Sequence, residues 1–224
     1  MFLTKAKGID LSGEKLLGLV DGAQAIVLTL LVIELPALII EAMEHVGEAS
    51  TLAFVVVTDL VGYLFAALII FDIWGLQKTV FEATKSSNIQ SLICVATLWL
   101  STLVPAFFFL TEKFAQDGFI ESHSLSAGAN FNEIVVFRSF LLATIWLIYF
   151  LLYAYVTNHA EIKKQNEISF VRELARLRIV ALAVIFLASL LASLVFGIAY
   201  ALVPFVLFVP VLFVSPKVSR FIGS

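Results

Sequence analysis

Four acidic residues lie within or at the ends of long apolar stretches of the sequence, namely Asp21, Glu34, Asp59 and Asp72. Burying an unpaired charge in apolar surroundings is costly, so each such side chain requires a partner or a function. Carboxylates in these places attract cations, relay protons or form structural ion pairs. We expect Asp72 to form a structural ion pair with Lys15 or Lys78. For Asp21, a helix-capping role and a functional role both remain open.

The residue types that bind metals or carry out catalysis show no suitable grouping. His45, His123 and His159 fall in expected loops without paired ligand spacing, and Cys94 is the single cysteine of the chain. Catalysis requires a nucleophile, a base or metal ligands gathered at one place. The net charge is −3, and no basic stripe carries interleaved aromatic residues. We therefore expect no catalytic residues, no metal site, no enzymatic activity and no nucleic-acid partner.

The composition predicts a membrane protein. Hydrophobic residues make up 61% of the 224 residues, charged residues make up 14%, and the mean hydropathy is +1.04. A soluble protein of this size could not bury so much apolar surface. The apolar stretches are about 20 residues long, which suits helices that cross a hydrocarbon core about 30 Å thick. A β-barrel would show shorter, alternating segments, so we expect an all-α integral membrane protein.

Six transmembrane helices are expected, forming one domain over residues 1–224 with a single repeat. Their expected ranges are 16–40, 52–76, 89–110, 132–156, 172–200 and 201–215. The last two share one apolar region that is too long for a single crossing at about 1.5 Å per residue. We expect this region to turn in a tight hairpin near Gly197, Tyr200 and Pro204.

The positive charges predict the orientation of these helices. Of the 14 lysines and arginines, all but Lys113 and Arg138 fall on one side of the expected helices. Loops rich in positive charge stay on the cytoplasmic side, so both termini are expected there. The opposite loops are acidic, and an acidic outer mouth would attract cations.

The first expected helix carries one apolar stripe. Ile26, Leu30 and Ile33 follow each other at i, i+4 and i+7, and Thr29 lies beside them. From periodicity alone, such a stripe in a membrane helix is a lipid-facing or packing surface.

A resemblance to a known family extends this interpretation. Asp21 is followed by the letters GAQAIVLTLLVIELP. Further features are Trp74 and Gln77 at the end of the second expected helix, Asn88, and residues 103–105 (LVP) with Phe107. Over roughly residues 15–110, the chain resembles the lysosomal potassium-channel family and its prokaryotic members, the transmembrane protein 175 family.

The resemblance implies a polar network at the start of the first helix, formed by Lys15, Asp21, Trp74 and Gln77. The chain departs from the family at several of these places. The signature Phe-Ser-Asp reads Leu19, Val20 and Asp21 here, and a signature arginine is Lys15. Gln77 stands where the family has a histidine. Valine lacks a hydroxyl, lysine lacks the guanidinium fork and glutamine does not titrate, so the network must be weaker or rewired.

The resemblance also implies a pore formed by four copies of the chain and lined by the first helix of each. The constriction falls on Ile26, Leu30 and Ile33, and the selectivity layer falls on Thr29. A ring of Glu34 at the outer mouth would concentrate cations. Apolar rings gate by dewetting and favour the ion with the most weakly held hydration shell. The expected function is a potassium-preferring cation channel that conducts K⁺ and needs no cofactor.

Two alternatives remain open. A proton-coupled transporter would use the intramembrane acids Asp21, Asp59 and Asp72 as titrating groups, although the sequence shows no inverted repeat. A non-conducting membrane protein derived from the channel family would explain the lost Phe-Ser pair. In each case the partners are the lipid bilayer and, for a channel, monovalent cations and further copies of the chain. We expect a multi-pass protein of the cell membrane, of the bacterial inner-membrane type.

Overall fold

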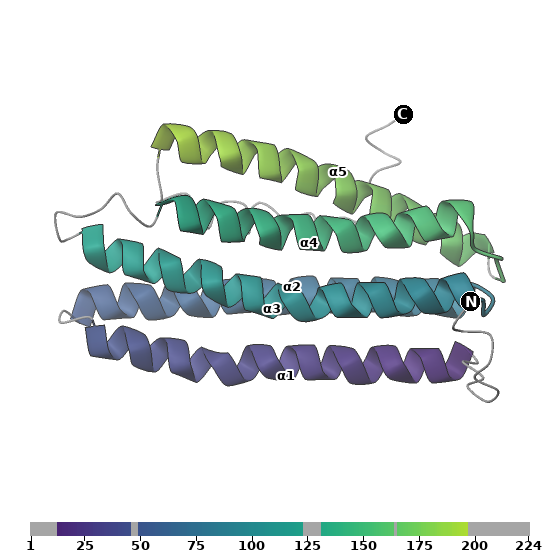
Figure 1. Ribbon diagram of the computed structural model, residues 1–224, viewed down its shortest axis with the longest axis horizontal. Helices are drawn as coiled ribbons and strands as arrows, with labels where there is room; N and C mark the ends of the chain where they lie inside the picture. Colours follow the sequence, from purple (N-terminus) through teal and green to yellow (C-terminus); the bar gives the residue numbers. More distant parts are fainter. Residues whose placement is uncertain (1–12, 46–48, 123–130, 164, 197–224) are drawn as a thin grey trace, which may run out of the picture.

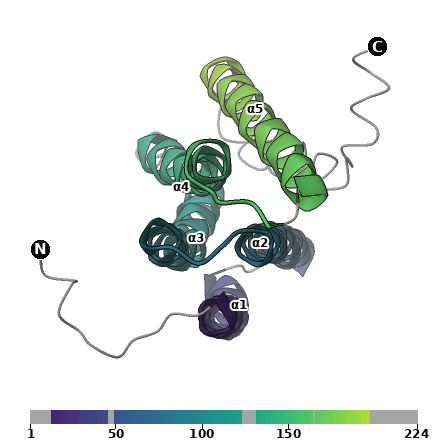
Figure 2. The ribbon, with the colours of Figure 1, turned by 90° about the vertical axis from the view of Figure 1, so that its right-hand side faces the viewer.

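The computed structural model describes residues 13–45, 49–122, 131–163 and 165–196, which form an all-α bundle of five helices. Their bounds are α1 Gly13–His45, α2 Ala49–Ala83, α3 Asn88–Ser122, α4 Phe131–Asn158 and α5 Gln165–Phe196. The helices run along the long axis of the molecule in alternating directions (Figure 1). Seen from one end, α1 and α5 lie at opposite edges, and α2, α3 and α4 lie between them (Figure 2).

Four of the described helices are long and apolar enough to cross a membrane. The candidate spans are Lys15–Ala37, Leu60–Ala83, Asn88–Thr111 and Val136–Asn158. Each lies in one of the first four helices, because these helices have long runs of apolar residues with few charges. The chain is therefore a multi-pass membrane protein.

The prediction of six transmembrane helices is wrong, because the structure describes five helices and four of them are candidate spans. The predicted fifth helix, 172–200, corresponds to α5, which begins at Gln165 with a charged first half. The charged residues of this half are Glu167, Arg172, Glu173, Arg176 and Arg178. The predicted sixth helix, 201–215, and the hairpin before it lie outside the described residues. The prediction divided one apolar region into two crossings, whereas the helix that enters this region begins with a charged half and is not among the candidate spans of the described residues.

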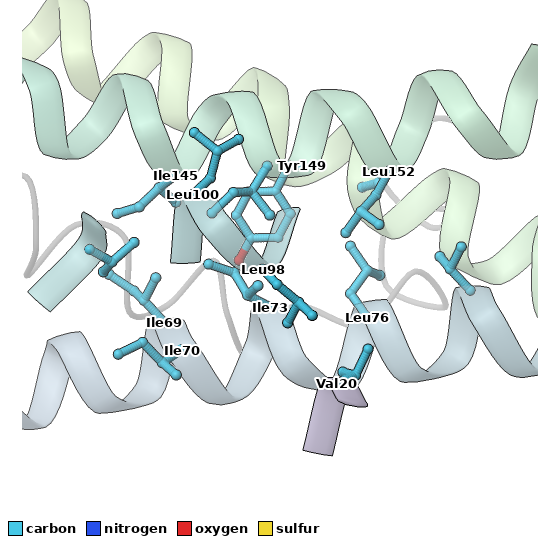
Figure 3. Close-up of a cluster of buried hydrophobic side chains, with 14 of the residues drawn as sticks. Val20, Ile69, Ile70, Ile73, Leu76, Leu98, Leu100, Ile145, Tyr149 and Leu152 are labelled. Atoms are coloured by element: carbon cyan, nitrogen blue, oxygen red, sulfur yellow. The ribbon is translucent and has the colours of Figure 1, made fainter. Parts of the chain in front are cut away.

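The core lies between the central helices. Figure 3 shows one part of it, in which α2 faces α4 and side chains from α1 and α3 complete the cluster. The labelled residues are Val20, Ile69, Ile70, Ile73, Leu76, Leu98, Leu100, Ile145, Tyr149 and Leu152. Each of these side chains is at most 8% exposed. Positions three and four residues apart on a helix lie on one face, so the spacing of these residues predicts such a seam.

The two turns at one end of the bundle are joined by a single β-bridge. Thr84 and Ile162 form an antiparallel bridge, and the Lys85 N–H donates to the Glu161 carbonyl at 2.8 Å. The Lys85 ammonium also lies 3.1 Å from the Glu161 carboxylate. This contact ties the turn between α2 and α3 to the turn between α4 and α5.

We call this end of the molecule the basic end. α1, α3 and α5 begin there, and α2 and α4 end there (Figure 1). Lys15, Lys78, Lys85 and Lys163 all lie near these helix ends. Arg138 lies near the opposite end, in the second turn of α4.

Candidate functional site

α1 lies at the edge of the bundle and packs against α2 and α3 (Figure 2). One stripe of α1 is buried against these two helices, and we call it the buried face. Its residues are Leu16, Val20, Gln24, Val27 and Leu31, each at most 1% exposed. Steps of three or four residues keep a stripe on one side of an α-helix, which explains why these positions share a face.

The opposite side of α1 is covered by no other part of the described chain, and we call it the uncovered face. Its residues are Leu19, Gly22, Ile26, Thr29, Leu30 and Ile33, all exposed. Ile26 is 61% exposed and Ile33 is 62% exposed, which is unusual for large apolar side chains unless lipid or another chain covers them. The three residues predicted to form the constriction thus share one face with the predicted selectivity residue.

Two polar side chains of α1 point away from the bundle. The Thr29 hydroxyl donates a hydrogen bond to the Ala25 carbonyl at 2.8 Å. The lone pairs of the Thr29 oxygen therefore remain free to accept from water or to face a cation. Glu34 is exposed, one helical turn beyond Leu30.

Asp21 joins α1 to α2 at the side of the buried face. The Trp74 indole donates to Asp21 Oδ1 at 2.8 Å, and the Lys78 ammonium lies 3.5 Å from Asp21 Oδ2. The same ammonium lies 5.8 Å from the centre of the Trp74 ring, within the range of a cation–π interaction. The structure thus brings together Asp21 and Trp74 of the predicted network. Lys15 is exposed on the first turns of α1 and takes no part in these contacts.

Gln77, the fourth residue of the predicted network, has a different partner. The Gln24 side chain donates from Nε2 to Gln77 Oε1 at 2.8 Å and to Ser101 Oγ at 3.2 Å. All three side chains are at most 1% exposed. The Ser101 hydroxyl in turn donates a hydrogen bond to the Thr97 carbonyl at 2.8 Å. This chain of neutral groups joins α1, α2 and α3 inside the bundle.

The sequence contains one signal that could have pointed to Gln24. It is the only amide side chain between Lys15 and Ala37, the candidate span of α1. A lone amide in a membrane helix is expected to hydrogen-bond across a helix interface. Its partners on α2 and α3 could not be deduced, because they lie 53 and 77 residues away.

Asp72 forms a second charged cluster, on the side of α2 that faces α4 and α5. The Arg178 guanidinium donates twice to the Asp72 carboxylate, at 3.1 and 3.2 Å, and the Tyr149 hydroxyl donates to it at 2.6 Å. Arg178 is 1% exposed. The expected structural ion pair of Asp72 therefore exists, but its expected partners were wrong. Lys78 is six residues from Asp72, about 120° around the helix, and so it reaches Asp21 instead.

The remaining candidates from the sequence are not brought together. His45 is the last residue of α1, His159 is exposed after the end of α4, and His123 lies outside the described residues. Cys94 is buried as a free thiol. Within the described residues, no three His, Cys, Asp or Glu side chains form a group that could hold a metal ion. Asp59 belongs to α2, but its side chain is outside the described part of the structure.

A comparison with protein families finds a similarity over the part of the chain that contains this site. The model of the family described as endosomal/lysosomal potassium channel TMEM175 matches residues 15–105. No curated protein and no solved structure is significantly similar to the chain. The match covers the candidate span of α1, α2 and the first half of α3, and it includes every contact of Asp21 and Gln24 given above. Over these residues, which make up less than half of the chain, the protein is similar to the TMEM175 potassium-channel family.

Proposed function

We propose that the protein is a potassium-preferring cation channel whose pore is lined by the uncovered faces of α1 from several copies of the chain. The observation that carries this proposal is the position of the four predicted pore residues. Ile26, Thr29, Leu30 and Ile33 share one face of α1, at the edge of the bundle, where no other part of the described chain covers them. A single helix cannot enclose an aqueous path, whereas a closed ring of identical helices can.

Four copies would form this ring, as the resemblance to the family implies. Ile26, Leu30 and Ile33 would then form successive apolar rings along the pore. An apolar ring offers an ion no ligand in place of its lost water, so it gates by dewetting. Potassium holds its hydration shell less tightly than sodium and would pass more easily, with modest discrimination.

Thr29 and Glu34 would assist conduction in different ways. A ring of Thr29 hydroxyls would turn oxygen lone pairs toward the ion, because each hydroxyl proton is bonded to Ala25 of its own helix. This ring would offset part of the cost of dehydration. A ring of exposed Glu34 carboxylates would raise the local concentration of cations at one mouth of the pore. No cofactor is required for these steps, and K⁺ is the transported ion.

The test is ion flux from the purified full-length protein in liposomes, under potassium, sodium and proton gradients. We expect passive potassium flux that exceeds sodium flux. Leu30→Asn and Ile26→Asn should raise the flux about tenfold and weaken the discrimination, because a barrier lower by about 1.4 kcal/mol has this effect. The matched control is Leu92→Asn, a similar change at a 67% exposed leucine of α3, which should leave flux unchanged.

Other outcomes would contradict the proposal in recognisable ways. Flux that requires a proton gradient would favour a transporter that uses the intramembrane acids. Absence of flux from folded oligomers would indicate a non-conducting member of the family. An equal response to Leu30→Asn and Leu92→Asn would show that α1 does not line the path. The cell membrane of a bacterium stays our prediction for the location of the protein.

A further inference from the structure

α1 carries nearly the same apolar side chains on its two sides. Those on the buried face are Leu16, Val20, Val27 and Leu31. Those on the uncovered face are Leu19, Ile26, Leu30 and Ile33. In water, burial of apolar surface would select the face that packs inward. Lipid tails are as apolar as leucine, so this selection is absent in a membrane. Apolar packing alone gives α1 little preference for one face over the other.

One side chain distinguishes the two faces. Gln24 lies in the middle of the buried face, between Val20 and Val27, and is 1% exposed. Its Nε2 donates to Gln77 Oε1 on α2 at 2.8 Å and to Ser101 Oγ on α3 at 3.2 Å. One amide group therefore links α1 to both of the helices against which it packs.

We propose that Gln24 sets the rotational register of α1, and thereby decides which side chains face the pore. A rotation of α1 by one residue, about 100°, would bring Ala23 or Ala25 to the place of Gln24. The buried groups of Gln77 and Ser101 would then lose the Gln24 amide, and a lost hydrogen bond between buried groups is not replaced by water. A single polar residue in a helix interface is a known way to specify register among otherwise equivalent packings.

The contacts of Asp21 constrain α1 less strictly. The Asp21 side chain is 43% exposed, and its cation is the long and flexible Lys78, itself 42% exposed. Such a pair can follow a small rotation of the helix without being broken. Gln24 is enclosed on all sides and has two neutral partners, so its bonds depend on the angle at which α1 presents it.

The register can be measured with spin labels, one at a time, on full-length protein in liposomes. Labels are introduced through Ile26→Cys and Val27→Cys in a Cys94→Ala background. The label at position 26 should be mobile and accessible to collision reagents, and the label at position 27 should be immobile. We expect Gln24→Leu to reduce the difference in accessibility from about tenfold to about twofold or less, because other rotations become populated.

Three variants keep the test decisive. Gln90→Leu is the matched control, because Gln90 is equally buried but bonds to Thr84 and to the Phe81 carbonyl rather than to α1. It should leave the pattern at positions 26 and 27 unchanged. Ser101→Ala removes one acceptor of the Gln24 amide and should give an intermediate pattern, so the test stands if Gln24→Leu does not fold. The proposal would be overturned if Gln24→Leu and Gln24→Leu/Gln77→Leu both kept the accessibility pattern that the unsubstituted protein shows at positions 26 and 27.

The consequence for conduction rests on the proposed function, but the register itself does not. A water-soluble nickel chelate that reaches position 26 indicates an aqueous pore, whereas oxygen dissolved in lipid indicates a lipid-facing surface. Access of oxygen alone would overturn the proposed pore and leave the role of Gln24 in the register intact. If the labels at positions 26 and 27 were equally accessible in the protein that retains Gln24, the register with Val27 buried and Ile26 uncovered would be wrong.

Discussion

The two sides of α2 hold their acids in different ways. On the side of α1, Asp21 is 43% exposed and has one indole donor and one distant ammonium group at 3.5 Å. On the side of α4 and α5, Asp72 is 18% exposed and receives three hydrogen bonds from Arg178 and Tyr149. Both acids come from apolar stretches that looked alike in the sequence.

The difference shows how burial determines the partners that an acid needs. A carboxylate enclosed between helices must receive several strong donors, because no water replaces a missing one. A half-exposed carboxylate can share its charge with water or headgroups, so one good donor is sufficient. We infer that the Asp72 cluster holds α2, α4 and α5 together, while the Asp21 cluster leaves α1 more freedom.

Arg178→Leu should have the largest effect on stability. It removes two of the three donors to Asp72 and leaves a mostly buried carboxylate, which costs about 3 kcal/mol or more. Titration of the protein in mixed micelles with a denaturing detergent measures the free energy of unfolding. The double variant Asp72→Asn/Arg178→Leu removes the stranded charge as well and should be more stable than Arg178→Leu alone. Equal stability of the two would contradict the importance of the buried charge.

Tyr149→Phe should have the second largest effect. It removes the shortest hydrogen bond to Asp72, at 2.6 Å, but leaves both bonds from Arg178 in place. We expect a loss of about 1.5 kcal/mol, in the upper range for hydrogen bonds between membrane helices. The same titration measures it, with Tyr153→Phe as a control at a tyrosine that does not bond to Asp72. A loss as large as that of Arg178→Leu would mean that the hydroxyl holds Asp72 more than the guanidinium does.

Trp74→Phe should have a smaller effect, on the other side of α2. It removes the indole donor to Asp21 and leaves a smaller aromatic ring in its place. The expected loss is about 0.6 kcal/mol, the average for an interhelical hydrogen bond in a membrane protein. Asp21→Asn keeps an acceptor oxygen for the indole, so it should cost less than Trp74→Phe. The reverse order would show that the charge of Asp21 matters more than this bond.

Lys78→Gln should have the smallest effect. The ammonium and the Asp21 carboxylate are both over 40% exposed and 3.5 Å apart. An ion pair of this kind contributes about 0.5 kcal/mol or less and weakens in salt. The free energies of unfolding of this variant and of the unsubstituted protein should therefore differ slightly at low salt and become equal at high salt. If Lys78→Gln lowered the free energy of unfolding nearly as much as Arg178→Leu does, the two sides of α2 would not differ in the way proposed.

Much of the fold could be predicted from local properties of the sequence. Apolar stretches of about 20 residues indicated the helices, and the spacing of Ile26, Leu30 and Ile33 put them on one face of α1. The number of crossings could not be predicted in this way. The apolar region that follows the charged first half of α5 was divided into two spans in the prediction, whereas the structure describes five helices, four of them candidate spans.

The candidate site likewise has a part that could be predicted from the sequence and a part that could not. Asp21 and Trp74 were expected in one network through the family resemblance, and they are hydrogen-bonded in the structure. The roles of Lys78, Gln24 and Ser101 were not anticipated, because each depends on the rotation of one helix against another. A lysine, a glutamine and a serine are compatible with many such rotations, and no local pattern chooses among them.

The sequence by itself determined that the chain is an all-α membrane protein with a first part similar to the TMEM175 family, because length, hydropathy and local motifs carry this information. Tertiary structure alone decided the partners of the buried polar groups and the face of α1 that remains uncovered. The reason is physical: lipid does not distinguish one apolar face of a helix from another. Contacts such as Gln24 with Gln77 and Asp72 with Arg178, 53 and 106 residues apart, make that distinction.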